Sequence, residues 1–305
     1  MKVRLRTGIA VDHAISEIEV IASNAHGAAT ALGEEHPSTV QERYVRWSVS
    51  AERQLLLVLD RVEVERIFAN ARHRDLCSMA VGNQINNLVN AEIASKHVEL
   101  TAIVDSLKET RNRLRSGTGY PAILDTNVLM QCLRPDQIDW NLVVGENDVR
   151  LMLPLRVIEE LDTKKYAGTD RQRRVARNVL PWLDQLLAGN ILGPVSARGP
   201  GNTTIEVMPI DRPRWRPSDA DEEILEAFQE VRQFTGRGKL ITADTGMRMR
   251  ARAEGIDILS VPDRYLRPTD PGTDAPPSRS FPDPLSIVGQ IAQIFRSRCN
   301  WRSRS

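Results

Sequence analysis

Residues 120–130 read Tyr-Pro-Ala-Ile-Leu-Asp-Thr-Asn-Val-Leu-Met, a short apolar run that ends at Asp125 and leads into a second one. We predict a strand at 122–124 and a helix at 127–133. The chain repeats this alternation as far as residue 267. Further strands are predicted at 149–154, 204–209, 239–242 and 256–261, and further helices at 155–165, 171–188, 219–234 and 245–254. Strands that alternate with helices predict an α/β fold, with a central parallel sheet covered by helices on both faces.

Residues 9–115, which precede this region, have a different composition and apolar spacing. Residues 9–115 are rich in Ala, Leu, Glu, Arg and Val and lack the alternation typical of strands, so we predict that they are helical throughout. One long helix is expected at about 40–71 and another at about 75–115. The segment Ser-Gly-Thr-Gly-Tyr-Pro at 116–121 marks a domain boundary. We therefore expect an all-α helical domain at 1–117, which could mediate homo-oligomer formation, bind a protein partner or position a substrate.

The C-terminal part follows a third pattern. Residues 268–284 contain many prolines and are predicted to form a linker. Residues 285–305 are predicted to form a short amphipathic helix that ends in a basic tail. The α/β region itself is expected at 121–267.

Composition argues against a strongly basic nucleic-acid-binding protein, a membrane-spanning protein and a secreted disulfide-rich protein. The chain carries 41 basic and 40 acidic side chains, so any nucleic-acid-binding surface must be local. No apolar stretch approaches the ~20 residues that span a bilayer, and the N-terminal apolar segment is too short for a signal peptide. Cys77, Cys132 and Cys299 are too widely spaced for a disulfide framework or a zinc motif. We expect a cytoplasmic protein.

Acidic residues mark the ends of predicted strands and the starts of predicted helices. They are Asp125, Glu159, Glu160, Asp219, Asp221 and Asp244. Ligands of parallel α/β sheets bind beyond the carboxyl ends of strands, which is where Asp125 and Asp244 fall. All five histidines lie before residue 100, and Cys132 is the one thiol of this region. Carboxylates and a hard divalent cation remain, and together they can hydrolyse a phosphodiester bond.

Each acidic residue also has a purely structural explanation. Asp125, Asp219 and Asp244 stand where the N-cap of the following helix is expected, and acidic residues in a first helical turn complement the helix dipole. Glu159 and Glu160 could belong to a solvated helix face. A shared site is favoured because all these residues fall at the same end of the predicted β-α units.

The same motifs carry a resemblance to a known family. Leu-Asp-Thr-Asn-Val-Leu at 124–129, Val-Ile-Glu-Glu-Leu-Asp at 157–162, Asp-Glu-Glu-Ile-Leu at 221–225 and Ile-Thr-Ala-Asp at 241–244 resemble, in order, the motifs of the PIN domain. The resemblance implies an α/β/α sandwich that cleaves RNA with Mg²⁺ or Mn²⁺. The implied catalytic and metal-binding residues are Asp125, Glu160, Asp221 and Asp244. Asp219 is implied as an additional metal ligand, Thr126, Asn127 and Thr242 as supporting residues, and Glu159 as the alternative to Glu160.

Basic residues follow the second acidic motif closely. They are Lys164, Lys165, Arg171, Arg173, Arg174 and Arg177, and we predict that they bind RNA, although a solvated helix face would have the same composition. Trp215, in a basic loop with Arg212, Arg214 and Arg216, could stack on an unpaired base or form a buried lid. Arg248, Arg250 and Arg252 form a weaker candidate, because alternate residues of a helix do not share a face.

The leading prediction is therefore a metal-dependent endoribonuclease whose substrate is RNA. The first alternative is a PIN-like module that binds RNA or protein with little turnover. A phosphatase with Asp125 as covalent nucleophile is disfavoured, because Asn127 stands where the second aspartate of such enzymes is expected. No Gly-rich phosphate loop of the Lys-Ser/Thr type occurs, which argues against an NTPase.

Overall fold

The computed structural model describes residues 3–29, 36–78, 84–188, 193–208 and 219–268. The chain divides into two compact units, Met1–Leu266 and Arg267–Ser305. The linker and tail helix predicted for the second unit lie outside the described residues from residue 269 onward. None of the described helices is long and apolar enough to cross a membrane.

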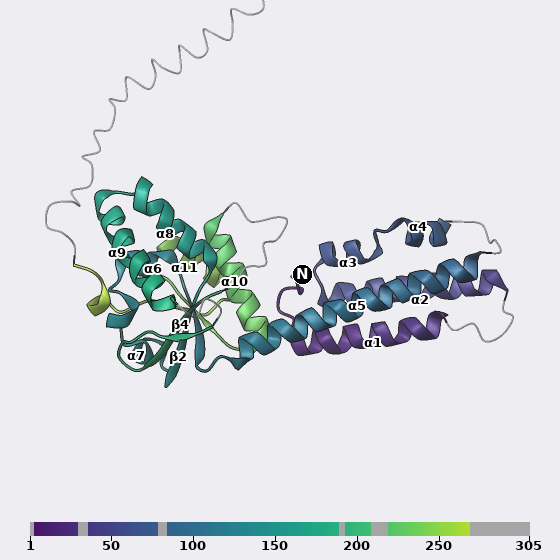
Figure 1. Cartoon of the computed structure of the whole chain (residues 1–305), viewed down its shortest axis with the longest axis horizontal. Coiled ribbons are helices and arrows are strands. Elements are labelled where there is room, and N and C mark those ends of the chain that lie inside the picture. Colours follow the sequence, from purple (N-terminus) through teal and green to yellow (C-terminus); the bar gives the residue numbers. More distant parts are fainter. Residues whose placement is uncertain (1–2, 30–35, 79–83, 189–192, 209–218, 269–305) are drawn as a thin grey trace, which may run out of the picture. The chain divides into compact units, whose positions relative to one another are not determined.

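The first part of the chain is helical, as predicted. Its helices are α1 (Val11–Ala29), α2 (Pro37–Val58), α3 (Arg61–Phe68), α4 (Ala71–Ser78) and α5 (Ile85–Ser116). The long helix α5 packs along α1 and α2, and the three run side by side in Figure 1. Their facing sides carry the buried apolar residues that the helical spacing predicted.

The helix predicted at about 40–71 is wrong, because the chain breaks at Leu59 and Asp60. Leu59 is buried and pairs with Leu5 in an isolated antiparallel bridge. Asp60 then starts α3 by accepting a hydrogen bond from the backbone of Val62 at 2.9 Å. A residue that binds a distant segment in extended form cannot remain helical, and helical spacing alone does not reveal that contact. The helix predicted at about 75–115 is likewise two helices, since α4 ends at Ser78 and α5 begins at Ile85.

A mostly parallel sheet with the strand order β3-β4-β2-β1-β5-β6 forms the second part. Its strands are β1 (Tyr120–Leu124), β2 (Asp148–Leu153), β3 (Val195–Ser196), β4 (Asn202–Val207), β5 (Lys239–Ile241) and β6 (Ile258–Leu259). All neighbours are parallel except β3, which pairs with β4 in antiparallel fashion. The prediction had missed β3, whose two residues are too few to show a periodicity.

Helices follow the strands as the alternation predicted. They are α6 (Thr126–Gln131), α8 (Leu155–Ala167), α9 (Asp170–Leu187), α10 (Ala220–Thr235) and α11 (Thr245–Ala253). The short helix α7 (Trp140–Val144) and the 3-10 turns at Pro135–Gln137 and Asp263–Tyr265 were not predicted. The predicted α/β sandwich preceded by a helical region is confirmed.

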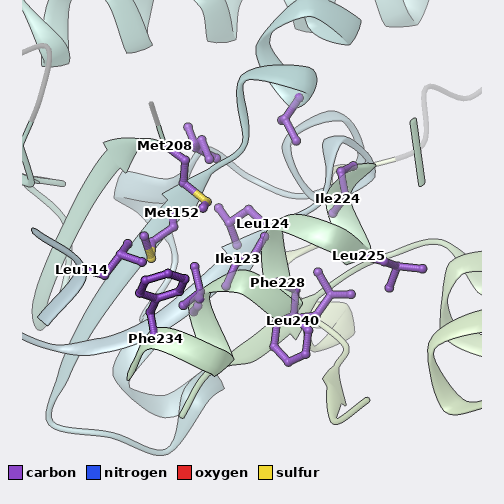
Figure 2. Close-up of a cluster of buried hydrophobic side chains, with 14 of the residues drawn as sticks. Leu114, Ile123, Leu124, Met152, Met208, Ile224, Leu225, Phe228, Phe234 and Leu240 are labelled. Carbon is purple, nitrogen blue, oxygen red and sulfur yellow. The ribbon is translucent and has the colours of Figure 1, made fainter. Parts of the chain in front are cut away.

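One hydrophobic core joins the sheet to α10 and to the end of α5. Figure 2 shows Phe228 and Ile224 of α10 near Ile123 and Leu124 of β1, with Leu114 of α5 in the same cluster. The other labelled members are Met152, Met208, Leu225, Phe234 and Leu240.

A buried ion pair adds a second link between α5 and the sheet. Arg150 of β2 lies 2.8 Å from a carboxylate oxygen of Glu206 on β4, and it donates a hydrogen bond of 2.6 Å to the carbonyl of Leu114. Gly117 makes this possible, because a Cβ at that position would lie 2.1 Å from Cζ of Arg150. The end of α5 is therefore held against the sheet by both apolar and polar contacts.

Candidate active site

The site begins where β1 and β5 end side by side. Leu124 pairs with Ile241 in parallel register, so Asp125 and Thr242 follow at the same edge of the sheet. The backbone N–H of Asp125 donates to the carbonyl of Ile241 at 3.0 Å. The hydroxyl of Thr242 donates to Oδ2 of Asp125 at 2.6 Å. Both side chains are buried, and Asp125 stands at the N-cap of α6, where the backbone of Asn127 also stabilises its carboxylate.

Asp244 joins this pair through the same hydroxyl. Oγ1 of Thr242 accepts a hydrogen bond from the backbone N–H of Asp244 at 2.9 Å. Asn127 donates from its side-chain amide to Oδ2 of Asp244 at 3.3 Å. The other oxygen of Asp244 caps α11 by accepting from the backbone of Met247 at 2.9 Å. The capping explanation is thus correct for Asp244, and one carboxylate oxygen still faces α6.

Glu160 is held by Thr126, the residue that follows Asp125. Thr126, a buried residue, donates from its hydroxyl to Oε2 of Glu160 at 2.5 Å. The neighbouring Glu159 lies 3.9 Å from Nη1 of Arg156 on the same helix. Of the glutamate doublet, Glu160 is therefore the residue that contacts the segment after β1.

The start of α10 brings the last two acidic residues. Asp219 caps this helix, since its Oδ1 accepts from the backbone N–H of Asp221 at 3.1 Å. Its Oδ2 accepts from Nη1 of Arg250 at 2.6 Å. That hydrogen bond is the main reason why the pKa of Asp219 is lowered. Both oxygens of Asp219 are engaged. The charge of Arg250 also acts on Asp221, where it opposes the rise in pKa that burial causes.

The charges of the four predicted carboxylates act on one another. Burial raises the pKa of Asp125, the hydrogen bond from Thr242 opposes that rise, and the charges of Asp221 and Glu160 add to it. Burial also raises the pKa of Asp221, with further increases from Asp219, Asp244 and Glu160. Each ionised carboxylate therefore disfavours ionisation of its neighbours, which is the electrostatic situation that a cation relieves.

The donor set suits a hard divalent cation, because it consists of carboxylate, hydroxyl and amide oxygens. Within the described ranges, no three His, Cys, Asp or Glu side chains already lie as a cluster that would hold a metal ion. The carboxylates are therefore neighbours that interact through charge, and the threonines and Asn127 hold them in place.

The predicted RNA-binding residues lie on α8 and α9, which pack on each other. Lys164 comes one helical turn after Glu160 and therefore shares its face of α8. Lys165 lies 4.0 Å from Asp162 and 5.2 Å from the ring centre of Tyr166. Trp215 lies outside the described residues.

On α9 the arginines differ in their surroundings. Arg173 is engaged by Asp170 and by the carbonyl of Gly168. Arg174 and Arg177 are exposed, and Arg171 is half-buried. The two exposed side chains are therefore the better placed to meet a polyanion.

Two arginines near the carboxylates were not singled out by the motifs. Arg250 contacts Asp219 directly, and the charge of Arg156 also lowers the pKa of Asp219, after the larger effect of Arg250. Arg156 precedes Glu160 by four residues, so its helical spacing was a usable signal. Arg250 could not be distinguished from Arg248 and Arg252 without knowing which face of α11 meets α10.

A comparison with protein-family models agrees with the family resemblance. The family model described as the PIN domain matches residues 122–261. Among solved structures, the chain is similar to a domain of a functionally unknown protein from Methanocaldococcus jannaschii DSM 2661. That match has 17% identity and a TM-score of 0.32, and it covers 51% of this chain and 100% of that one. The search of curated proteins found no match. The family match includes all four acidic motifs. It also includes the strands β1 to β6, apart from the first two residues of β1. The match identifies this part of the chain as a PIN domain.

Proposed function

We propose that this chain is a metal-dependent endoribonuclease that hydrolyses phosphodiester bonds of RNA. PIN domains are generally nucleases, and they usually bind divalent metals. The observation that carries the proposal is the gathering of Asp125, Glu160, Asp221 and Asp244 around the carboxyl ends of β1 and β5, with mutual charge effects that a cation would relieve.

The four carboxylates would hold Mg²⁺ or Mn²⁺. Such an ion, when bound, neutralises phosphate charge and lowers the pKa of a bound water. The chain's own residues fix the donors. Thr242 orients Asp125, Thr126 orients Glu160, and Asn127 holds Asp244. These contacts are the second layer that fixes metal ligands in position.

We assign Asp219 to positioning rather than to the metal. Its two oxygens bind the backbone of Asp221 and the guanidinium of Arg250. It therefore fixes the first turn of α10 and so the place of Asp221. Glu159 is assigned to the ion pair with Arg156 for the same reason.

The RNA strand would lie over α8 and α9. Lys164 shares a helix face with Glu160, and Arg174 and Arg177 are exposed on the adjacent helix. A polyanion that approaches four carboxylates needs positive charge close by, because the site would otherwise repel it.

The deciding experiment is cleavage of end-labelled single-stranded RNA and DNA by the full chain in Mn²⁺, Mg²⁺ or EDTA. Asp125→Asn and Asp244→Asn should abolish cleavage and most of the thermal stabilisation by Mn²⁺, since a ligand that binds only the native state stabilises it. The matched control is Asp105→Asn, which makes the same change at an exposed position of α5. Cleavage that survives Asp125→Asn, or that persists in EDTA, would rule out the proposed site.

A binding module with little turnover is the second candidate. In that case wild type and Asp125→Asn would bind RNA equally well, and neither would cleave it in any metal.

A further inference from the structure

Two arginines from different helices, Arg250 of α11 and Arg156 of α8, act on the carboxylate of Asp219. We propose that Arg156 and Arg250 form a phosphate-binding subsite for a phosphodiester group of the RNA strand next to the one that is cleaved. In the structure the carboxylate of Asp219 holds the place of that phosphate. The inference rests on the proposed nuclease function, because it assigns residues that bind the RNA substrate at the same site.

Arg250 supplies the direct contact. Its Nη1 lies 2.6 Å from Oδ2 of Asp219, and both side chains are 45% exposed. An exposed ion pair contributes little to stability. The guanidinium can therefore exchange this carboxylate for another anion at low cost. A phosphate is a strong competitor, because an arginine can bind two of its oxygens at once.

Arg156 of α8 acts on the same carboxylate through its charge, which stabilises the ionised form of Asp219. Its ion pair with Glu159 is long at 3.9 Å. Nε of Arg156 is buried and has no hydrogen-bond partner in the structure. A buried N–H without an acceptor is costly, so the side chain loses no hydrogen bond of this atom when it turns outward to bind a phosphate.

The spacing of charged residues along α8 indicates the direction in which the RNA strand would run. Arg156, Glu160 and Lys164 are four residues apart, so they form one stripe on the helix face. At 1.5 Å per residue, Arg156 and Lys164 lie about 12 Å apart along the axis, with Glu160 midway. Positive charge therefore flanks the catalytic carboxylate on both sides, as a strand that continues past the cleaved bond requires.

A groove next to Arg250 is unsuitable for RNA. Arg250 lines this groove of about 360 Å³ together with Glu222, Glu226 and Glu254. These carboxylates would repel a phosphate backbone. The strand is thus expected to run from the arginine pair towards Lys164 and not along α10.

The test measures binding without cleavage. A short fluorescein-labelled single-stranded RNA is titrated with the full chain in EDTA at several salt concentrations, followed by fluorescence anisotropy. Arg250→Gln and Arg156→Gln should each weaken binding about tenfold. Each should also reduce the slope of log Kd against log salt by about 0.7, the value for one phosphate contact on a single strand. The matched control is Arg252→Gln, which removes the same charge from an exposed position two residues further along α11 and should leave the slope unchanged.

Asp219→Asn is expected to strengthen RNA binding, whereas the arginine substitutions weaken it. Asparagine caps helices about as well as aspartate, so α10 should keep its start, while the anion that occupies the arginines is gone. RNA binding in EDTA should become several-fold tighter, and thermal stabilisation by Mn²⁺ should stay at the wild-type level while Asp221→Asn abolishes it.

Three outcomes would overturn the inference. If Arg250→Gln and Arg252→Gln bind RNA alike, the subsite is wrong while cleavage by the wild type still stands. If Asp219→Asn loses Mn²⁺ stabilisation as Asp221→Asn does, Asp219 is a metal ligand and does not hold a phosphate position. If the wild type does not bind RNA at all, the proposed function fails together with the subsite.

Discussion

The hydroxyl of Thr242 connects two carboxylates of the site, and its removal is a sharp test of how they are held. It donates to Asp125 at 2.6 Å and accepts from the backbone of Asp244 at 2.9 Å. The side chain is fully buried, so water cannot easily replace either contact. Thr242→Val keeps the shape of the side chain and removes only the hydroxyl function.

The expected loss follows from these two contacts. A hydrogen bond to a charged group contributes about 1.5–3 kcal/mol, and an unsatisfied buried N–H costs about 1–3 kcal/mol. The added methyl group recovers about 0.8 kcal/mol of burial. We therefore expect the free energy of unfolding at neutral pH to fall by about 2–5 kcal/mol. At roughly 2–4 °C per kcal/mol, the Tm should fall by about 4–20 °C.

Metal affinity should suffer as well. Burial raises the pKa of Asp125, and the Thr242 hydrogen bond is the larger of the two hydrogen bonds that oppose this rise, the other coming from the backbone of Asn127. Without it the carboxylate binds its proton more tightly and competes less well for a cation. Loss of a residue that orients a metal ligand typically weakens affinity by about 10–100-fold.

The assay is thermal unfolding of wild type, Thr242→Val and Thr242→Ser over a range of Mn²⁺ concentrations. Serine retains the hydroxyl and loses a methyl group, so it should keep near-wild-type Mn²⁺ affinity at a modest cost in Tm. Two results would refute the reasoning. One is an unchanged Mn²⁺ affinity in Thr242→Val, and the other is an equal loss of affinity in both variants, which would attribute the effect to packing.

Three further predictions concern the ion pair, the pH dependence and the RNA surface. Glu206→Gln should cost about 3–5 kcal/mol in urea unfolding, because it leaves Arg150 buried and unpaired, and a loss below 1 kcal/mol would show that the pair is hydrated. Because the pKa of Asp125 is raised in the fold, its contribution to stability is present below the unfolded value of 3.8 and is lost as the pH rises through the folded value. Asp125→Asn in EDTA should therefore have a flatter dependence of Tm on pH and a higher Tm at neutral pH, and a lower Tm there would contradict this sign. Arg177→Ala should weaken RNA binding more than Arg173→Ala, since Arg173 is engaged within its own helix end, and anisotropy that ranks them in reverse order would place the strand elsewhere.

The strand ends were predictable because their signals are local. Asp125 and Asp244 each follow an apolar run directly, and parallel strands end at the same edge of a sheet. Neighbouring register then brings Thr242 to Asp125 without further information. The predictions for these residues needed only the alternation of strands and helices.

Features that depend on distant contacts were not predictable in this way. The helix breaks at Leu59 because Leu59 pairs with Leu5. The sequence of residues 40–71 does not indicate that partner. The choice of Arg250 over Arg252 depends on which face of α11 meets Asp219. Such contacts are set by tertiary packing, which overrides local propensity.

Helix α10 gives a physical reason why a helical region accompanies this PIN domain. Its first turn carries Asp221, and its last turns contact the helical region, where Gln233 donates to the carbonyl of Arg6 at 2.8 Å and Arg115 donates to that of Phe234 at 2.8 Å. The two ends are about 24 Å apart along one continuous helix. Phe234 is also buried in the core shared with α5. A shift of α5 would therefore move one end of the helix whose other end carries Asp221, and we propose that the helical region supports the site in this way.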